Sequence, residues 1–464
     1  MRSSRTTALA LTGALSFTLL AACSSGSDDA GEGDGTSGGK TVLRVVSLLP
    51  GSEQEAFDAF DEQVAQFEQA NPDIDVQPEE YEWKATTFAA QLAGGTLPDV
   101  FEIPFTDGKT LIENGQLADI DAQVQALPYA DDFNPNVLEA GTGADGKVYA
   151  IPAKSVYGIG LHYNRALFEQ AGLDPDDPPT TWDEVRADAK TIADATGQAG
   201  YATMTQNNTG GWQLTVATYA RGGRVQETND DGTYTATLDN DGTKEALEYL
   251  HDLRWEDNSM GANFLLDWSS INQAFAAGQV GMYTSGSDVY TSLVQTNAIN
   301  PDDYGLTAVP LEGDDAGVLG GGTLAAVSTS ASEAQKEAAV KWIDFYYLRK
   351  LTDQDAAVKD AETLVASDQP VGTPVLPIFS QEQYDESQTW IADLVNVPLD
   401  QMTGFTDVIF DQPLVPEPAG STQELYGALD TVVQAVLTDE DADIDALLEQ
   451  ADADVQAILD KNAG

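Results

Sequence analysis

The stretch DGKVYAIPAKSVYGIGLHYNRALFEQAGLDPDDPPTTWDE, residues 145–184, decides how the chain folds. It opens on an Asp-Gly turn, and the apolar runs at 148–151 and 156–163 predict two strands. We expect Pro152 to end the first strand, because proline cannot donate a hydrogen bond to a neighbouring strand. The first half of the stretch therefore predicts one strand that ends and a second that begins close by.

Two helices are predicted in the second half of the stretch. A short helix begins at Asn164 and ends at Gly172. After a rigid proline pair at 178–179, Thr181 and Glu184 have the spacing of a capping box. In that motif the threonine oxygen accepts a hydrogen bond from an orphan backbone amide, and the glutamate reaches back. The stretch therefore leaves one layer of strands, crosses, and starts a new helical layer.

Strands and helices alternate before this stretch. The continuous apolar run at 42–49 predicts a strand buried on both faces of a parallel sheet, and further strands are predicted at 74–76 and from Val100. Between the first two strands, Ser52 is expected to cap a helix whose phenylalanines recur at helical spacing. This alternation predicts a doubly wound α/β lobe.

Several short motifs occur in an order that resembles one protein family. DGKVYAIP, HYNRALFEQAGLD and PPTTWDEV follow one another within 145–185, GTLPDV occupies 95–100, and INQAFAAGQVGMY occupies 271–283. The series resembles the extracellular solute-binding proteins (family 1, sugar-type) of bacterial ABC transporters. In that family the central segment leaves the first lobe, passes the hinge beside the ligand and enters the second lobe. The resemblance extends from about residue 42 to about residue 462 and is weakest at 381–417.

The resemblance implies a two-lobed α/β fold of the periplasmic-binding-protein type (type II). Its ligand cleft would lie between the lobes, and its hinge would consist of several crossings of the chain. The implied boundaries are 41–153 plus 324–372 for the N-lobe and 154–323 plus 373–464 for the C-lobe, with crossings near Ala153, Thr323 and Thr373.

The N-terminus has the pattern of an export signal. Two arginines precede an apolar run shorter than the ~20 residues that span a membrane, so residues 1–22 are predicted to be a signal peptide. Leu20-Ala21-Ala22-Cys23 resembles a bacterial lipobox, in which the cysteine is lipidated. Residues 23–40 are then the lipidated cysteine and a flexible polar tether. The alternative is an ordinary cleavage site with an incidental cysteine.

The chain is strongly acidic. It has 21 basic and 77 acidic side chains and a formal net charge of −56. Phosphate binding needs a basic face, so this charge argues against nucleic acid as a partner. We interpret the acidity as a well-solvated surface that repels itself and resists aggregation; adaptation to a salty or acidic medium is the alternative.

The sequence offers no recognisable catalytic constellation. Its two histidines are His162 and His251, and Cys23 is its only cysteine, so a histidine–cysteine metal cluster is unavailable. The zinc motif H-E-x-x-H is absent, and the acidic turns at 230–232 and 240–242 do not match a calcium loop. Both histidines are expected to be structural. A pair among the many carboxylates at glycosidase spacing keeps a surface-anchored glycoside hydrolase as the alternative function.

A sugar site needs aromatic faces for the C–H surfaces of the ring, and carboxylates, amides and backbone N–H groups for the hydroxyls. In open α/β sheets such groups meet at the carboxyl ends of strands. The residues expected to bind ligand on these grounds are Glu53, Trp83, Glu102, Ser155, Tyr157, Trp212, Trp268, Ser285, Gly286, Ser287, Asp288, Gly321, Gly322 and Thr323.

The tryptophans and glycines in this set each have a structural alternative. Trp83 and Trp268 are equally compatible with packing in a core. Trp212 is the favoured stacking residue, because the glycines at 210–211 are expected to leave backbone exposed beside it. Its replacement by alanine should then reduce affinity more than stability. The glycines at 320–322 serve either a tight turn or, as the resemblance favours, the ligand side or hinge. Three other tryptophans are expected in the core: Trp182, Trp255 and Trp342.

The resemblance also implies the partners. They would be a carbohydrate ligand, the permease subunits of an ABC importer, and beyond them its ATPase. The protein would be a monomer, held at the outer face of the cell membrane by its lipid anchor, with no enzymatic activity, cofactor or metal. The sequence does not name the sugar.

Overall fold

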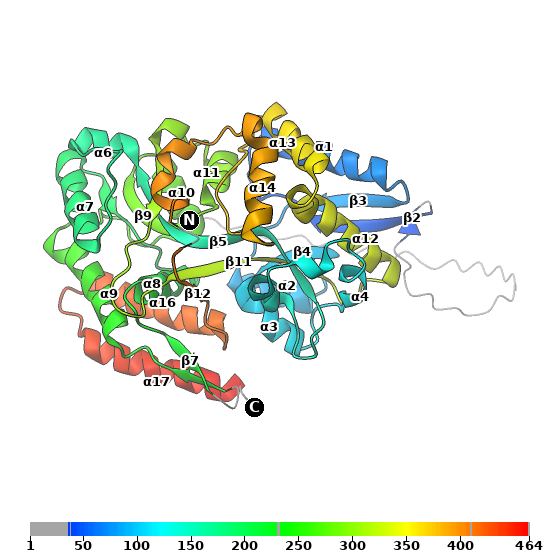
Figure 1. The fold of residues 1–464 in the computed structure, drawn as a ribbon. Helices are drawn as coiled ribbons and strands as arrows, with labels where there is room; N and C mark the ends of the chain where they lie inside the picture. The colour runs from blue at the N-terminus through cyan, green and yellow to red at the C-terminus, as the bar shows by residue number, and fades with distance from the viewer. Residues whose placement is uncertain (1–35, 38, 230–232, 409–410, 463–464) are drawn as a thin grey trace, which may run out of the picture. The chain divides into compact units, whose positions relative to one another are not determined.

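The computed structural model describes residues 36–37, 39–229, 233–408 and 411–462 (Figure 1). The predicted signal peptide (1–22), Cys23 and most of the predicted tether lie outside the described residues. None of the described helices combines the length and apolar character that crossing a membrane requires.

One ten-stranded sheet runs through the fold, in the order β1-β2-β4-β11-β5-β9-β6, with β3 on β2, β10 on β5 and β12 on β11. A two-stranded ribbon, β7-β8, stands apart from it. The strands are β1 (Thr36–Ser37), β2 (Lys40–Val46), β3 (Ile74–Glu79), β4 (Val100–Pro104), β5 (Ala150–Asn164), β6 (Ala199–Tyr201), β7 (Gln226–Thr228), β8 (Tyr234–Ala236), β9 (Val280–Gly286), β10 (Tyr304–Ala308), β11 (Val318–Val327) and β12 (Leu414–Pro416).

Seventeen α-helices are found in the described residues. They are α1 (Gln54–Ala70), α2 (Ala85–Ala93), α3 (Phe105–Glu113), α4 (Asp121–Val124), α5 (Pro135–Leu138), α6 (Arg165–Ala171), α7 (Trp182–Thr196), α8 (Thr209–Tyr219), α9 (Asp241–His251), α10 (Trp268–Ala276), α11 (Val289–Asn297), α12 (Glu333–Ile343), α13 (Gln354–Ala366), α14 (Gln381–Ile391), α15 (Thr403–Thr406), α16 (Thr422–Thr438) and α17 (Ile444–Asn462).

Two long antiparallel strands, β5 and β11, join the two halves of the sheet (Figure 1). One half contains the parallel strands β3, β2 and β4, and the other contains β9, β6 and β10. Helices α1, α12 and α13 lie with the first half, and α6, α7 and α10 lie with the second. Helix α14 packs against α13, although the predicted boundaries assign these two helices to different lobes.

The prediction that Pro152 ends a strand is wrong, because β5 continues through it. Pro152 pairs with Leu324 and Val156 pairs with Gly322, so Thr323 alone faces the three residues 153–155. A bulge of this kind tolerates a residue that cannot donate to the ladder, and it also bends the strand. The bulge lies at the crossings predicted near Ala153 and Thr323.

The glycines at 320–322 lie inside β11 and form no tight turn. Strand β9 extends through Gly286, so Ser285 and Gly286 lie inside the strand. Ser52 does not cap α1: its hydroxyl donates to the carbonyl oxygen of Leu49, and Glu53 occupies the N-cap position without a side-chain bond. The Ser52 hydroxyl is thus hydrogen-bonded across the turn at 50–51 instead of to an amide of α1.

The two helices predicted in the second half of the central stretch are confirmed. Asn164 caps α6 by accepting from the Leu167 amide, and Gly172 ends that helix with φ 77°. The capping box of Thr181 and Glu184 begins α7. These local signals place the second helical layer directly after β5.

The first half of the sheet is buried on both faces. Val45 and Val100 pack in the larger core, whereas Val46 and Phe101 belong to a second cluster on the opposite side. In the larger core, Trp342 is fully buried, as predicted, and meets the ring of Phe67 edge-on at 5.2 Å. This arrangement leaves the carboxyl ends of β3 and β4 free to face the second half.

Candidate functional site

A cavity of about 330 Å³ lies where both halves of the sheet present strand ends and helix starts. The first half contributes the loop after β3 and the end of β4. The second half contributes the starts of α8, α10 and α11, the end of β9, and residues of α16. The main lining side chains are Tyr81, Glu82, Trp83, Lys84, Glu102, Tyr157, Asn207, Asn208, Trp212, Asp267, Trp268, Ser269, Ser285, Asp288, Ser292, Thr323, Glu417, Gln423 and Tyr426.

Three tryptophans reach this cavity from different elements. Trp83 and Trp268 are half-buried, and the indole N–H of Trp83 donates to Asp107 at 3.1 Å. Trp268 is the first residue of α10, directly after the helix cap Asp267. Trp212 is only 9% exposed, and its ring meets Tyr157 edge-on at 6.2 Å. Trp83 and Trp268 therefore offer more free ring surface than Trp212.

The reason given for favouring Trp212 is wrong, because the glycines beside it are buried. A Cβ on Gly211 would lie 2.2 Å from the carbonyl oxygen of Tyr426, so the glycine permits close packing of α8 against α16. The backbone N–H groups of Asn208 and Gly211 donate to the carboxylate of Asp430. The indole nitrogen of Trp212 has no hydrogen-bond partner among the described residues.

The cavity wall is acidic. Five carboxyl groups line it, from Glu82, Glu102, Asp267, Asp288 and Glu417. Lys84 is the single basic residue among the described residues of the wall, and its ammonium pairs with Glu82 at 2.9 Å. The electrostatic balance therefore disfavours an anionic occupant.

Two carboxyl groups at the site have strongly raised pKa values. Burial raises the pKa of Glu417 to about 8, although Tyr426 donates a hydrogen bond to it at 3.0 Å. Burial also raises the pKa of Asp107 to about 7, against the opposing hydrogen bond from Trp83. Each carboxyl also raises the cost of ionising its acidic neighbours. Of the two, Glu417 lines the cavity, and near neutral pH its carboxyl donates as well as accepts hydrogen bonds, as a hydroxyl-rich ligand requires.

Asp267 has the opposite behaviour. Burial acts to raise its pKa, but hydrogen bonds from Ser270 and Asn207 outweigh this and lower it. Its carboxylate accepts from the Ser270 amide at 2.9 Å and from the Asn207 side chain at 2.9 Å. Asp267 is therefore a fixed, charged acceptor beside Trp268.

The two halves also touch at the rim of the cavity. The side-chain amide of Gln423 donates to the Thr106 hydroxyl at 2.8 Å. The backbone N–H of Glu53 donates to the carbonyl oxygen of Gln295 at 2.9 Å. These contacts hold the walls of the site together.

Comparison with known proteins identifies the family. The model of the family described as bacterial extracellular solute-binding protein matches residues 50–350. The chain belongs to this family. The predicted family is thus confirmed.

Curated relatives carry one recurring name. The sn-glycerol-3-phosphate-binding periplasmic protein UgpB of Yersinia pestis is 29% identical over 157 residues, 32% of this chain and 33% of that protein. UgpB of Salmonella typhimurium is 25% identical over 329 residues, 66% of this chain and 70% of that protein. The match therefore spans only about a third of the length of the Yersinia relative.

Solved structures of solute-binding proteins share the fold. One is an ABC transporter solute-binding protein from Thermotoga lettingae bound with α-D-tagatose, with TM-score 0.70 and 20% identity over 90% of this chain and 99% of that chain. Another is UgpB from Mycobacterium tuberculosis in complex with glycerophosphocholine, with TM-score 0.69 and 19% identity over 92% and 100%. The predicted two-lobed α/β fold is confirmed.

Most residues predicted to bind ligand lie at the wall of this solute-binding protein's cavity. These are Trp83, Glu102, Tyr157, Trp212, Trp268, Ser285, Gly286, Asp288, Gly322 and Thr323. The structure brings them together, but their contact with ligand stays a prediction. Ser155 lies in β5, and its side chain is outside the described part of the structure.

Three predicted residues do not reach the wall. Glu53 is the N-cap of α1, and Ser287 is fully buried with its N–H on the carbonyl oxygen of Gly158. Gly321 packs against Tyr157, whose hydroxyl would lie 2.6 Å from a Cβ at that position. Gly321 therefore makes room for a wall residue.

Sequence reasoning missed several residues of the wall. Tyr81, Glu82 and Lys84 follow β3, and the strand-end rule that selected Glu102 would have found them. Asn207 and Asn208 have positive φ (59° and 69°), which asparagine adopts more readily than most residues. Glu417, Gln423 and Tyr426 come from a distant segment, and no local pattern marks them.

The remaining side chains considered at the sequence level are structural. His162 is buried and hydrogen-bonds the Tyr304 hydroxyl at 2.8 Å, and burial lowers its pKa to about 4. Trp182 is buried, as predicted. Trp255 is only half-buried, so its predicted core position is wrong; its indole N–H donates to the carbonyl oxygen of Val436. No metal-binding group of three or more His, Cys, Asp or Glu side chains is found among the described residues.

Proposed function

We propose that this solute-binding protein captures a sugar or oligosaccharide outside the membrane and delivers it to the permease of an ABC importer. The observation that carries the proposal is the composition of the cleft, where the rings of Trp83 and Trp268 stand among carboxyl, amide and hydroxyl groups. Aromatic faces suit the C–H surfaces of a sugar ring, and the polar groups suit its hydroxyls.

The charge of the cleft separates a sugar from a phosphate ester. A phosphate needs several donors or cations, and Lys84, the single base at the wall, is already paired with Glu82. Five carboxyl groups would repel a phosphate placed among them. The chain would therefore differ in ligand from the glycerol-3-phosphate-binding relatives named above, and a neutral saccharide fits the wall better.

Capture would proceed by closure of the two lobes. The bulge that faces Thr323 with residues 153–155 supports a hinge at this crossing, because a bulge bends the strand locally. The rim bond between Gln423 and Thr106 would form on closure. Since α14 packs on α13, we assign residues 373–394 to the N-lobe and keep the other boundaries as proposed above.

The partners and the location follow from the family and the N-terminal sequence. The monomeric protein would be exported, lipidated at Cys23 and held at the outer face of the cell membrane, close to the permease. Replacing Cys23 with alanine should release the protein into the medium or leave it unprocessed, which fractionation and intact-mass measurement would detect. A variant that is still processed and still membrane-bound would refute the anchor.

A thermal-shift screen tests the proposed ligand class. Ligands that bind only the native state raise the melting temperature, by an amount that corresponds to about 2.7 kcal/mol at one hundred times Kd. Mono- and oligosaccharides should give shifts, and glycerol 3-phosphate and glycerophosphocholine should give none. Shifts with the phosphate compounds alone would overturn the proposal.

The same samples test for turnover. Binding without catalysis predicts that the best-binding saccharide is recovered unchanged after prolonged incubation. The alternative of a glycoside hydrolase has no support from the relatives named above, which are binding proteins. Steady release of shorter sugars that stops when one pair of cleft carboxylates is replaced would favour the glycoside hydrolase instead.

A further inference from the structure

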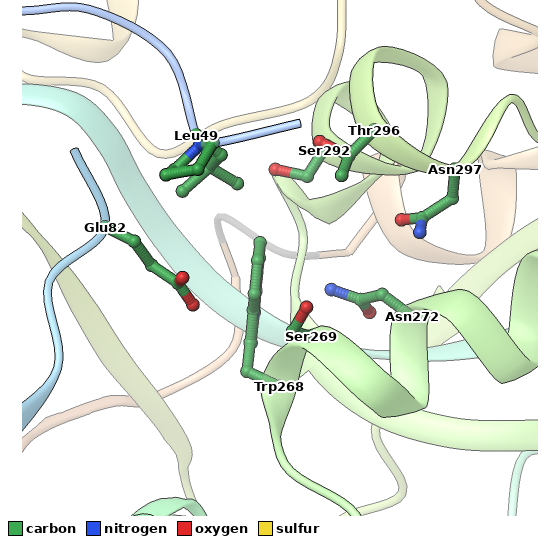
Figure 2. Close-up of a pocket in the computed structure, with 9 residues that line it drawn as sticks. Leu49, Glu82, Trp268, Ser269, Asn272, Ser292, Thr296 and Asn297 are labelled. Atoms are coloured by element: carbon green, nitrogen blue, oxygen red, sulfur yellow. The ribbon is translucent and has the colours of Figure 1, made fainter. Parts of the chain in front are cut away.

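A second, smaller cavity of about 30 Å³ opens beside the main cleft (Figure 2). Trp268, Glu82, Leu49, Ser269 and Ser292 line both spaces, so the two are adjacent. Figure 2 shows the Trp268 ring standing between the Glu82 carboxylate on one side and the Asn272 amide on the other. The residues that belong to the small cavity alone are Pro50, Asn272, Thr296 and Asn297.

The back wall of this side pocket comes from two helices. Trp268 and Asn272 are one turn apart on α10, and Ser292 and Thr296 are one turn apart on α11, so each pair lies on a single helix face. Leu49, which follows β2, covers the pocket from the other half of the sheet. Residues of both lobes therefore enclose it.

Asn272 is the polar group that most needs a partner. Asn272 is 1% exposed, and its side-chain oxygen accepts from the Tyr283 hydroxyl at 2.9 Å. That bond orients the amide, and its NH₂ group has no acceptor among the described residues. The Thr296 hydroxyl in the same pocket is likewise buried and unpartnered within the described chain. A buried donor without an acceptor costs free energy, so the pocket is suited to a group that accepts and donates hydrogen bonds.

The size and charge of the pocket limit which chemical group of a ligand it can hold. A single water needs roughly 10–15 Å³ of cavity volume, so a pocket of about 30 Å³ holds about two non-hydrogen atoms. Glu82 is its one charged lining residue and is paired with Lys84. A neutral group of one carbon and one hydroxyl fits this space, whereas a whole sugar ring does not.

We propose that the side pocket is a subsite for the exocyclic hydroxymethyl group of the sugar unit that lies against Trp268. This inference rests on the proposed saccharide function. The hydroxymethyl oxygen accepts from the Asn272 amide and its hydroxyl donates to the Thr296 oxygen, while its carbon lies against Leu49 and the edge of Trp268. The cleft then discriminates hexoses from the pentoses that lack this group.

The test uses pairs of sugars that differ only in the hydroxymethyl group. The probes are D-glucose with D-xylose, D-galactose with L-arabinose, and cellobiose with xylobiose, measured by titration calorimetry. The best-binding hexose compound should bind roughly tenfold tighter than its pentose counterpart. Replacing Thr296 with valine removes a hydroxyl that has no partner among the described residues, so stability should hold while the hexose-to-pentose ratio falls roughly threefold. Asn272→Leu should reduce the ratio further.

Thr191→Val is the matched control, because Thr191 lies on α7 and its hydroxyl bonds its own helix at the Ala187 carbonyl. It should leave the ratio unchanged. Equal binding of hexose and pentose by the unaltered protein, or an unchanged ratio in Thr296→Val, would overturn the subsite and leave saccharide binding intact. Absence of binding to every saccharide would instead overturn the proposed function, and the subsite with it.

Discussion

The starts of α8 and α10 both place a tryptophan at the cleft, but they do so in different ways. At α8, glycines 210–211 are buried, the helix packs tightly on α16, and Trp212 is 9% exposed. At α10, Asp267 caps the helix and Trp268 remains half-buried. Both line the wall, but the first tryptophan is buried in it, whereas the second keeps part of its side chain exposed.

The difference shows what a glycine next to a tryptophan means in a folded chain. A Gly-Gly pair suggests exposed backbone when it is considered locally. In α8 the missing side chains instead allow another helix to come close, so the neighbouring tryptophan is buried. Asp267 caps its helix with its own side chain, and the Trp268 that follows it remains partly exposed.

The largest expected effect is on stability at α8. Trp212→Ala should lower the free energy of unfolding by about 3–5 kcal/mol, as for other buried tryptophans. Chemical denaturation of the unliganded protein measures it. If the variant unfolds at the same denaturant concentration as the original, the wall role of Trp212 is wrong and the free stacking role is restored.

The next effect tests the packing of α8 directly. Gly211→Ala should cost about 3 kcal/mol, because its Cβ would lie 2.2 Å from a backbone oxygen that cannot move easily. Gly320→Ala is the matched control, since its Cβ would meet no atom closer than 3.6 Å and should cost under about 1 kcal/mol. Equal melting temperatures for the two variants would contradict the close approach of α8 and α16.

At α10 the expected effect is on affinity. Trp268→Ala should weaken the best-binding saccharide by about 2 kcal/mol, roughly thirtyfold, with little change in unfolding. Calorimetric titration and denaturation of one preparation separate the two quantities. A large loss of stability with intact affinity would make Trp268 a wall residue like Trp212.

Local sequence signals predicted the parts of the fold that are determined locally. The caps at Asn164 and Thr181 each depend on residues within three positions, and both are confirmed. Whether a strand ends at Pro152 depends on the pairing of β5 with β11, which lies more than 160 residues away. The strand end at Pro152 was therefore predicted wrongly. The family resemblance supplied the two lobes, which no single motif determines.

The cleft was predictable only where its residues follow strands of the sheet. Glu102 and Asp288 were found by this rule. Glu417 and Tyr426 were not, because β12, the strand before Glu417, is only three residues long and ends on a proline, and Tyr426 reaches the cleft from helix α16. The free ring of Trp268 and the buried ring of Trp212 looked alike in sequence, since burial depends on which helix packs against each.

The smallest expected effect compares the carboxyl groups beside α16 and at the start of α10. Glu417, held by Tyr426 of α16, has a pKa raised to about 8. An acid whose pKa is higher in the folded state than in the unfolded chain gives stability that is complete below the unfolded pKa and is lost as pH rises through the folded value. The unliganded protein should therefore lose about 1 kcal/mol of stability through Glu417 between pH 7 and pH 8. Glu417→Gln should remove this loss.

Asp267→Asn is the matched variant on the α10 side. Because the pKa of Asp267 is lowered in the fold, its contribution is fully present above the unfolded value and is lost only as pH falls through the folded value. Its replacement should cost the same at pH 7 and at pH 8. Asp107, whose pKa is raised to about 7, contributes its own pH dependence of stability in both variants. The quantity to compare is therefore the difference between the two variants in their stability change from pH 7 to pH 8. Denaturation curves at the two pH values measure that difference. If Glu417→Gln and the unaltered protein lose stability equally over this range, Glu417 is already ionised at neutral pH, and the donor role of its carboxyl in the cleft is wrong.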